Sequence, residues 1–242
     1  MIYTVKNWSL KKLRSLFTLS LIGATIFLTS CFDDENTMPL PPAAYVLVYQ
    51  GSPDAPDMDI YANQNKINNF PVKYTDGISY GPFYIGERTF RFTSVNSLSV
   101  ILEKNFMVKA DSVYSIFVLN NVDQIDAVMV QDEWEDPIAD EAQIRLVNLS
   151  PDAGKVSLEV SGIESAFTDD LEFGSASDFD GISNGIYDLT IKSQSSGEVL
   201  VTANNIELKG NRVYTLILRG LESSSDNNKK LDLQLITNYT NY

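Results

Sequence analysis

The stretch YVLVYQGSPDA at residues 45–55 decides the fold, because it returns as QIRLVNLSPDA at residues 143–153, 98 positions further on. In each copy an apolar run leads into Ser-Pro-Asp-Ala. A second pair of segments, DSVYSIFVL at 111–119 and NRVYTLILR at 211–219, matches at a spacing of 100. A third match, at a spacing of 99, pairs Tyr80 with Phe179 and Gly86 with Gly185. Three ordered matches at nearly constant spacing indicate an internal duplication, which predicts two tandem globular repeats.

Both repeats have the residue pattern of β-strands. Every second residue is apolar in the segments 58–61, 88–92, 187–192 and 231–235. The segments 113–119 and 213–218 are nearly continuous apolar or aromatic runs, as in central strands. Turn residues separate these segments, namely Ser52-Pro53-Asp54, Asp76-Gly77, Asn120-Asn121, Ser196-Gly197 and Lys209-Gly210-Asn211. Short strands with such turns predict an all-β chain of two tandem immunoglobulin-like antiparallel β-sandwich domains, with no amphipathic helix after residue 30.

Acidic residues gather around Pro137 between the repeats, in the segment 132–141. That composition predicts an exposed acidic linker between a first repeat at 44–131 and a second at 142–242. A calcium site is the alternative, because carboxylates are the ligands that calcium prefers. The segment 177–181 also has the acidic residues of a calcium loop. It predicts a turn instead, because Leu189 stands where the loop's bidentate glutamate is expected.

Residues 1–30 predict a lipoprotein signal peptide. Four basic residues, Lys6, Lys11, Lys12 and Arg14, precede an uncharged apolar run that ends at Ser30. This run is shorter than the roughly 20 residues that a spanning helix needs. The sequence Leu-Thr-Ser-Cys at 28–31 resembles the lipobox of bacterial lipoproteins. The resemblance implies that Cys31 is linked to diacylglycerol, freed by cleavage on its amino side, and acylated with a fatty acid such as palmitate.

Residues 31–43 predict an acidic, proline-rich tether. The sequence Phe-Asp-Asp-Glu-Asn at 32–36 resembles the acidic export signal of surface lipoproteins of the Bacteroidetes, and a merely soluble tether is the alternative. The prolines that follow favour an extended chain. Cys31 is the only cysteine, so no intramolecular disulfide can form. We therefore expect an outer-membrane, lipid-anchored protein that faces the cell exterior.

The charge of the chain argues against a nucleic-acid partner. Removal of residues 1–30 takes away four of the 18 basic residues and none of the 32 acidic ones, which leaves 14 against 32 and a net charge of −18. Such a balance repels nucleic acid and anionic lipid head groups. Hydrophobic residues at 44% are enough for a packed core, so the acidity is a surface property.

The two Ser-Pro-Asp-Ala elements, each placed between strands in a chain with a lipoprotein leader, resemble bacterial domain-of-unknown-function family 4397. Pro56 extends the element in the first copy, and Gly154 replaces that proline in the second. The resemblance covers residues 44 to about 130 and 142 to about 237. It implies a compact β domain on exported proteins and no particular activity.

The residue types of most catalytic sites are missing. The chain has no histidine, which excludes the commonest general base, the usual nucleophile pairs and imidazole zinc ligands. A carboxylate pair, as in glycoside hydrolysis, is what remains. Asp57 with Asp59, or Asp169 with Asp170, could supply one, but strand alternation predicts that Asp57 and Asp59 lie on a solvated face. We therefore expect no enzyme activity, no cofactor and no metal.

Two features are candidate ligand sites. The Ser-Pro-Asp elements are either ligand loops or turns in which Ser and Asp bind nearby backbone amides, and the turn is favoured. Tyr74, Tyr80 and Tyr84 lie among turn residues, so their rings are expected to be exposed and could stack on a sugar. The Asp-Ser-Val sequence at 111–113 resembles an acceptor for O-glycosylation in the Bacteroidetes.

The function predicted from these features is a lipid-anchored, non-enzymatic binding, adhesion or structural module of the cell surface. Its partners would be the membrane, through the lipid, and an extracellular protein or glycan. The alternative is an accessory glycan-binding lipoprotein of a nutrient-uptake system. A component of an envelope or fibre assembly is a third hypothesis.

Overall fold

The computed structural model describes residues 41–241, and almost all of its regular structure is β-strand. A short 3₁₀ turn, η2 (Val122–Gln124), interrupts the strands, and the described part of the chain contains no α-helix. Pro41–Tyr242 forms one compact unit. The predicted signal peptide, Cys31 and residues 31–40 of the predicted tether lie outside the described residues.

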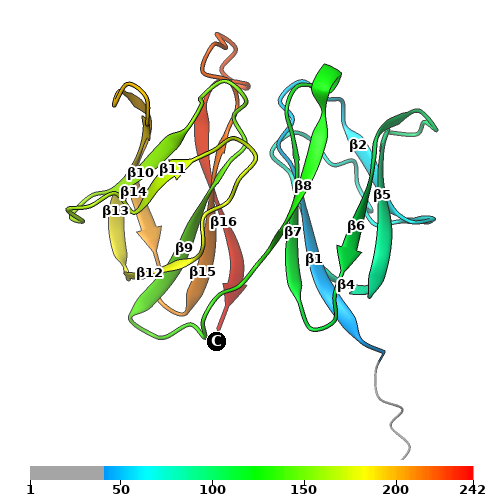
Figure 1. Ribbon diagram of the computed structural model, residues 1–242, viewed down its shortest axis with the longest axis horizontal. Coiled ribbons are helices and arrows are strands. Elements are labelled where there is room, and N and C mark those ends of the chain that lie inside the picture. Colours follow the sequence, from blue (N-terminus) through cyan, green and yellow to red (C-terminus); the bar gives the residue numbers. More distant parts are fainter. Residues whose placement is uncertain (1–40, 242) are drawn as a thin grey trace, which may run out of the picture. The chain divides into compact units, whose positions relative to one another are not determined.

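The first repeat is a sandwich of two four-stranded sheets (Figure 1). Sheet A has the order β4-β1-β7-β8, with strands β1 (Ala43–Gln50), β4 (Gly77–Tyr84), β7 (Val113–Leu119) and β8 (Asp126–Gln131). Sheet B has the order β3-β2-β5-β6, with strands β2 (Met58–Ala62), β3 (Asn65–Lys66), β5 (Gly86–Ser94) and β6 (Val100–Val108). The alternating segments predicted at 58–61 and 88–92 lie in β2 and β5. The apolar run at 113–119 is β7, a central strand as predicted.

The second repeat has the same architecture. Sheet C has the order β12-β9-β15-β16, with strands β9 (Glu141–Asn148), β12 (Asp180–Ser183), β15 (Arg212–Arg219) and β16 (Asp232–Thr240). Sheet D has the order β11-β10-β13-β14, with strands β10 (Val156–Val160), β11 (Thr168–Leu171), β13 (Gly185–Ser193) and β14 (Val199–Leu208). The predicted all-β class with two sandwiches is confirmed.

Sheets A and C each contain one parallel strand pair, which corrects the expectation of wholly antiparallel sheets. β1 runs parallel to β7, and β9 runs parallel to β15. The chain leaves β1 for sheet B, returns as β4 on one side of β1, visits sheet B again, and comes back as β7 on the other side. A crossover of that length can return the chain in the same direction, whereas a tight hairpin cannot.

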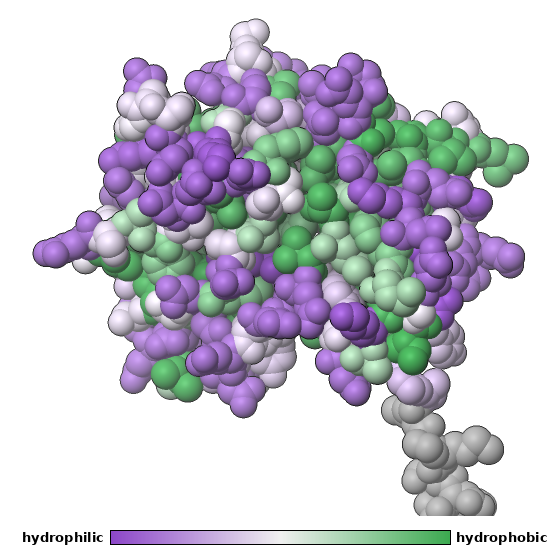
Figure 2. Space-filling view, in the orientation of Figure 1, coloured by the Kyte–Doolittle hydropathy of each residue, from purple (hydrophilic) through white to green (hydrophobic). Residues whose placement is uncertain are grey.

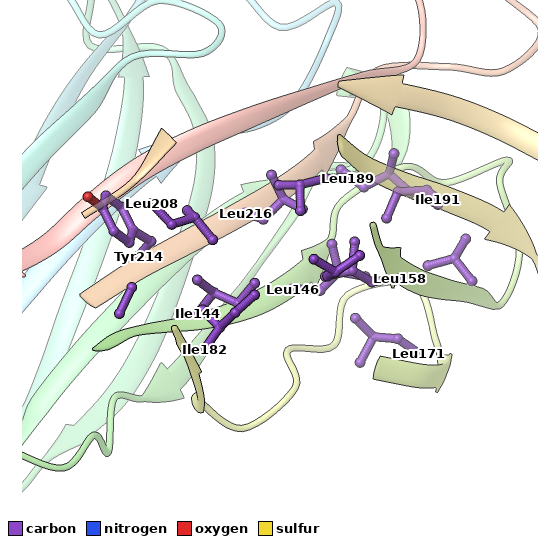
Figure 3. Close-up of a cluster of buried hydrophobic side chains, with 14 of the residues drawn as sticks. Ile144, Leu146, Leu158, Leu171, Ile182, Leu189, Ile191, Leu208, Tyr214 and Leu216 are labelled. Atoms are coloured by element: carbon purple, nitrogen blue, oxygen red, sulfur yellow. The ribbon is translucent and has the colours of Figure 1, made fainter. Parts of the chain in front are cut away.

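Each sandwich encloses its own hydrophobic core. In the second repeat, Leu146, Leu158, Leu189 and Leu216 point toward one another from four different strands (Figure 3). Val48, Ile60, Phe90 and Ile116 take corresponding places in the first repeat. These side chains are almost completely buried. Each contributes roughly 1.5–3 kcal/mol by leaving water, so the alternating strand pattern stabilises both sandwiches.

A third hydrophobic core joins the two repeats, and we call it the inter-repeat core. It lies on the faces of sheets A and C that are turned away from their own sandwiches. Its buried members are Leu47, Tyr49, Phe117 and Leu119 from the first repeat, and Val147, Leu149 and Ile217 from the second. The central strands of sheets A and C are thus buried on both faces, which explains why they are continuous apolar runs rather than alternating ones.

Candidate functional site: the paired Ser-Pro-Asp loops

The two Ser-Pro-Asp elements lie in the loops that follow β1 and β9. Gly51 and Leu149, the residues just before each element, are packed together, since a Cβ added to Gly51 would lie only 2.7 Å from Leu149 Cδ1. The two loops are therefore neighbours. The described chain enters the first sandwich at Ala43, at the other end of β1. At 3.3 Å per residue, this strand of eight residues holds the loops about 26 Å from that point (Figure 1).

The aspartate of each element ties two loops of its own repeat together. Asp54 accepts a hydrogen bond of 2.8 Å from the backbone N–H of Val122, in the β7–β8 loop. Asp152 accepts bonds from the N–H groups of Glu222 and Ser223, at 2.8 and 3.0 Å, and from the Ser223 hydroxyl at 2.7 Å. The structure therefore favours a scaffold role for the motif. It corrects one detail, because each aspartate binds a distant loop rather than a nearby amide.

The surroundings of Asp152 favour its charged form. Burial alone would raise the pKa of this carboxyl, but the backbone N–H groups of Ser223 and Glu222 and the hydroxyls of Ser223 and Ser150 outweigh burial and lower the pKa. Both carboxylate oxygens are occupied by donors from the protein. Asp152 is therefore a charged clamp between loops rather than a free ligand group.

Exposed apolar side chains lie at the same end of the first repeat. Leu98 stands on the β5–β6 hairpin with 96% of its surface exposed, and Val100 and Val122 are about half exposed. Backbone hydrogen bonding from Val95 to Asp57 brings this hairpin to the β1–β2 loop. Figure 2 shows hydrophobic surface gathered there, at the upper right. Apolar surface gathered on loops in this way is typical of contact sites for a partner.

The structure separates the three tyrosines predicted to form a ligand site. Tyr84 is 68% exposed, as expected. Tyr74 is only partly exposed, and its ring lies 5.6 Å from the guanidinium of Arg219 in the second repeat. Tyr80 is also partly buried and donates a 2.6 Å hydrogen bond to Asp132. The expectation of exposed rings is therefore wrong for Tyr74 and Tyr80, because contacts between the repeats cover both.

Tyr80 belongs to a polar network between the repeats that the sequence analysis missed. Arg145 forms an ion pair of 2.6 Å with Asp132, and these two side chains are 1% and 0% exposed. Ser115 donates to the same carboxylate at 2.7 Å, and the Nε of Arg145 donates to Thr215 at 3.0 Å. Burial and the charge of Asp132 raise the pKa of Tyr80, so its hydroxyl stays a donor. The predicted linker is therefore buried at Asp132, not exposed.

A cleft of about 550 Å³ lies beside this network, against the segment 132–141. Its walls combine aromatic and acidic groups, namely Glu133, Trp134, Glu135, Glu141, Gln143, Phe179, Asp180 and Gly181. Trp134 stacks on Tyr239 and meets Phe179 edge on. Among the described residues, no three acidic side chains gather closely enough to hold a metal ion, so the calcium alternative finds no support there.

The carboxylate pairs considered for catalysis are not free pairs. Asp59 is buried and forms an ion pair of 2.6 Å with Lys66, which corrects the expectation that it is solvated. The hydrogen bond from Lys66 lowers the pKa of Asp59, and burial opposes this only in part. Asp170 is exposed and forms an ion pair with Lys155. In each pair, a lysine therefore forms an ion pair with one of the two carboxylates.

Comparisons with known proteins match part of the chain to a family whose function is unknown. Residues 44–159 match the family described as "Domain of unknown function (DUF4397)". No curated protein matches the chain. One similar solved structure, named "putative cell adhesion protein", comes from Bacteroides fragilis, with 8% identity over 82% of this chain and 99% of the other, and a TM-score of 0.23. Another of that name, from Parabacteroides distasonis, has 9% identity over 82% and 99% of the two chains, and a TM-score of 0.21. At these scores neither structure bears on function.

The family match begins in β1, crosses the segment 132–141 and ends in β10, so it includes both Ser-Pro-Asp-Ala elements. No helix in the described range has the length and hydrophobicity needed to span a membrane. The resemblance predicted from Ser-Pro-Asp-Ala is confirmed over residues 44–159, the part of the chain that matches DUF4397.

Proposed function

We propose that residues 44–242 are the binding head of a lipid-anchored, non-enzymatic surface module, and that the head presents loops from both repeats to an extracellular protein. One observation carries this proposal. The two Ser-Pro-Asp loops adjoin each other at the end of β1 opposite to the point where the chain enters the head. Asp54 and Asp152 hold these loops in place, and exposed apolar side chains lie beside the first one.

In this proposal the anchor is Cys31, and residues 31–43 hold the head away from the outer membrane, on its exterior side. The lipobox and the acidic segment after it support this placement. Acyl chains contribute about 0.8 kcal/mol per buried methylene, so an anchor with several chains is stable. The test is Cys31→Ser in cells fed labelled palmitate. We expect no label and no partition with membranes, and an unchanged membrane fraction would remove the anchor from the proposal.

The head is tested by crosslinking on intact cells. Leu98→Ser combined with Val122→Ser should lower the recovery of a crosslinked protein neighbour several-fold, because both side chains are exposed at the loop end. Ile138→Ser is the matched control, since Ile138 is also an exposed apolar residue, 58% exposed, but lies between the repeats in the chain. Hydrolysis of a polysaccharide or peptide panel by residues 32–242 at enzyme-like rates would contradict the proposal that the head is non-enzymatic.

A glycan-binding role is the second candidate, and the cleft at Trp134 and Phe179 is the observation that favours it. Aromatic faces bordered by carboxylates and an amide suit the apolar and hydroxyl faces of a sugar. Glycan-array binding that is lost in Trp134→Ala and kept in Tyr84→Ala would support this role. An array with no retained glycan would dismiss it.

A further inference from the structure

Equivalent positions in the two repeats carry different residues at the inter-repeat core. Leu47 in β1 pairs with Ser115 in β7, and Arg145 in β9 pairs with Thr215 in β15, so Leu47 and Arg145 occupy the same place in their sheets. Both side chains are buried. One repeat thus places an apolar side chain where the other places a positive charge.

The partner of Arg145 shows the same difference. Ser115 and Thr215 are equivalent residues, and they donate hydrogen bonds to Asp132 and Asn238, which therefore occupy equivalent places. The first repeat therefore offers a carboxylate and the second an amide. Across the interface Arg145 and Asp132 meet at 2.6 Å, while Asn238 accepts a hydrogen bond from Thr215 and donates one to Tyr80. The positive charge of Arg145 on sheet C therefore lies against the negative charge of Asp132 from the first repeat.

The shapes of the two faces differ in the same complementary way. Gly51 and Leu149 are equivalent, because their N–H groups bond to the carbonyls of Val118 and Leu218, both at 2.8 Å. Leu149 fills the space above Gly51, since a Cβ there would lie 2.7 Å from its Cδ1. Two first repeats face to face would leave this space empty, and two second repeats would bring two leucines into it.

Pairing of like faces would also bury charge without compensation. Two copies of sheet A would place Asp132 in the interface with no guanidinium, and two copies of sheet C would place Arg145 there with no carboxylate. A buried charge without its partner is strongly destabilising. An element that penalises wrong pairs gives specificity even where it adds little net stability.

We propose that the outer faces of sheets A and C are a matched pair, in which each face accepts the other and rejects a copy of itself. The partner of either face is therefore the complementary repeat, from the same chain or from a second copy. Two copies of this chain can associate through these faces only by exchanging repeats, with the first repeat of one bound to the second repeat of the other.

The test uses the full mature chain with a protease site inserted after Asp136, cleaved after folding. Isotope-labelled and unlabelled preparations are mixed, and native mass spectrometry counts the pairs. We expect first-with-second pairs only. The double variant Arg145→Leu with Asp132→Asn gives each face the residue that the other already has, Leu47 or Asn238. It should raise the share of like pairs at least about tenfold.

The matched control is Lys104→Leu with Asp126→Asn, which removes a surface ion pair of 2.7 Å within the first repeat and should leave the pairing unchanged. Like pairs in the wild type at the level of the double variant would overturn the proposal. Separation of the cleaved wild-type halves would overturn it too, and a double variant that still forms no like pairs would overturn the role of Arg145 and Asp132 in it.

Discussion

At the scale of single residues, the clamp made by Asp152 should contribute measurably to stability. Asp152→Asn removes the charge that three donors of the β15–β16 loop share. Hydrogen bonds to charged groups contribute about 1.5–3 kcal/mol, and exposure to solvent reduces this. We expect the free energy of unfolding in urea to fall by about 1 kcal/mol. Asp54→Asn should cost less, since it removes one such bond.

The effect of Asp152→Asn should also depend on pH. The folded protein lowers the pKa of this carboxyl below that of the unfolded chain, about 3.9. Its contribution is therefore complete above that value and is lost as the pH falls through the folded pKa. Wild type and variant should differ fully at pH 7 and converge below about pH 4. A difference that stays constant down to pH 2 would show that the charge of Asp152 is not what holds the loop.

The residues differ in how far the sequence could predict them. Ser-Pro-Asp could be predicted as a loop, because the two copies return in the same context and the side chains are turn formers. The burial of Arg145 could not be predicted. In the segment 143–146 it alternates with Ile144 and Leu146, a pattern that predicts a solvated face for Arg145. The sequence shows neither that this face is covered by the other repeat nor that the partner of Arg145 lies beyond a proline-containing connection. The same lack of tertiary information hid the burial of Asp59.

At the scale of elements, the strands with a long apolar run or a clear alternation were the predictable ones. β7 and β15 are long apolar runs, and β5 and β13 alternate. The short edge strands β3, β11 and β12 were not predicted, since segments of two to four mostly polar residues are too short for a periodic signal. The parallel pairing of β1 with β7 is set by long crossovers, which local patterns do not specify.

One element-scale prediction concerns the contact between the loops that follow β1 and β9. Gly51→Ala would place a Cβ 2.7 Å from Leu149 Cδ1 and 2.8 Å from the carbonyl of Val118. Overpacking of this kind costs about 1–3 kcal/mol, and chemical denaturation should show it. Gly81→Ala is the control, because its Cβ would meet only ordinary contact at 4.0 Å. Leu149→Ala should partly rescue Gly51→Ala, and a cost unchanged by that second substitution would assign the effect to Val118 alone.

At the scale of the whole molecule, the two sandwiches should behave as one cooperative body. A tandem of independent domains would bury little between them, yet the inter-repeat core buries seven apolar side chains and an ion pair with its hydrogen-bonding partners. The duplicated sequence predicted both sandwiches correctly. It could not predict that the two sandwiches pack against each other, because the residues that form this contact are the ones in which the repeats differ.

Calorimetry tests whether the two sandwiches unfold cooperatively. We expect the wild-type chain, residues 32–242, to unfold in a single transition, because opening the inter-repeat core would expose both repeats' buried faces together. Arg145→Leu leaves the Asp132 carboxylate buried without its cation, which costs about 3–5 kcal/mol at the interface alone. The transition should then split in two, as each sandwich keeps its own core. Asp132→Asn added to Arg145→Leu removes the stranded charge and should restore one transition. Two resolved steps in the wild type would instead mean that the sandwiches are thermodynamically independent.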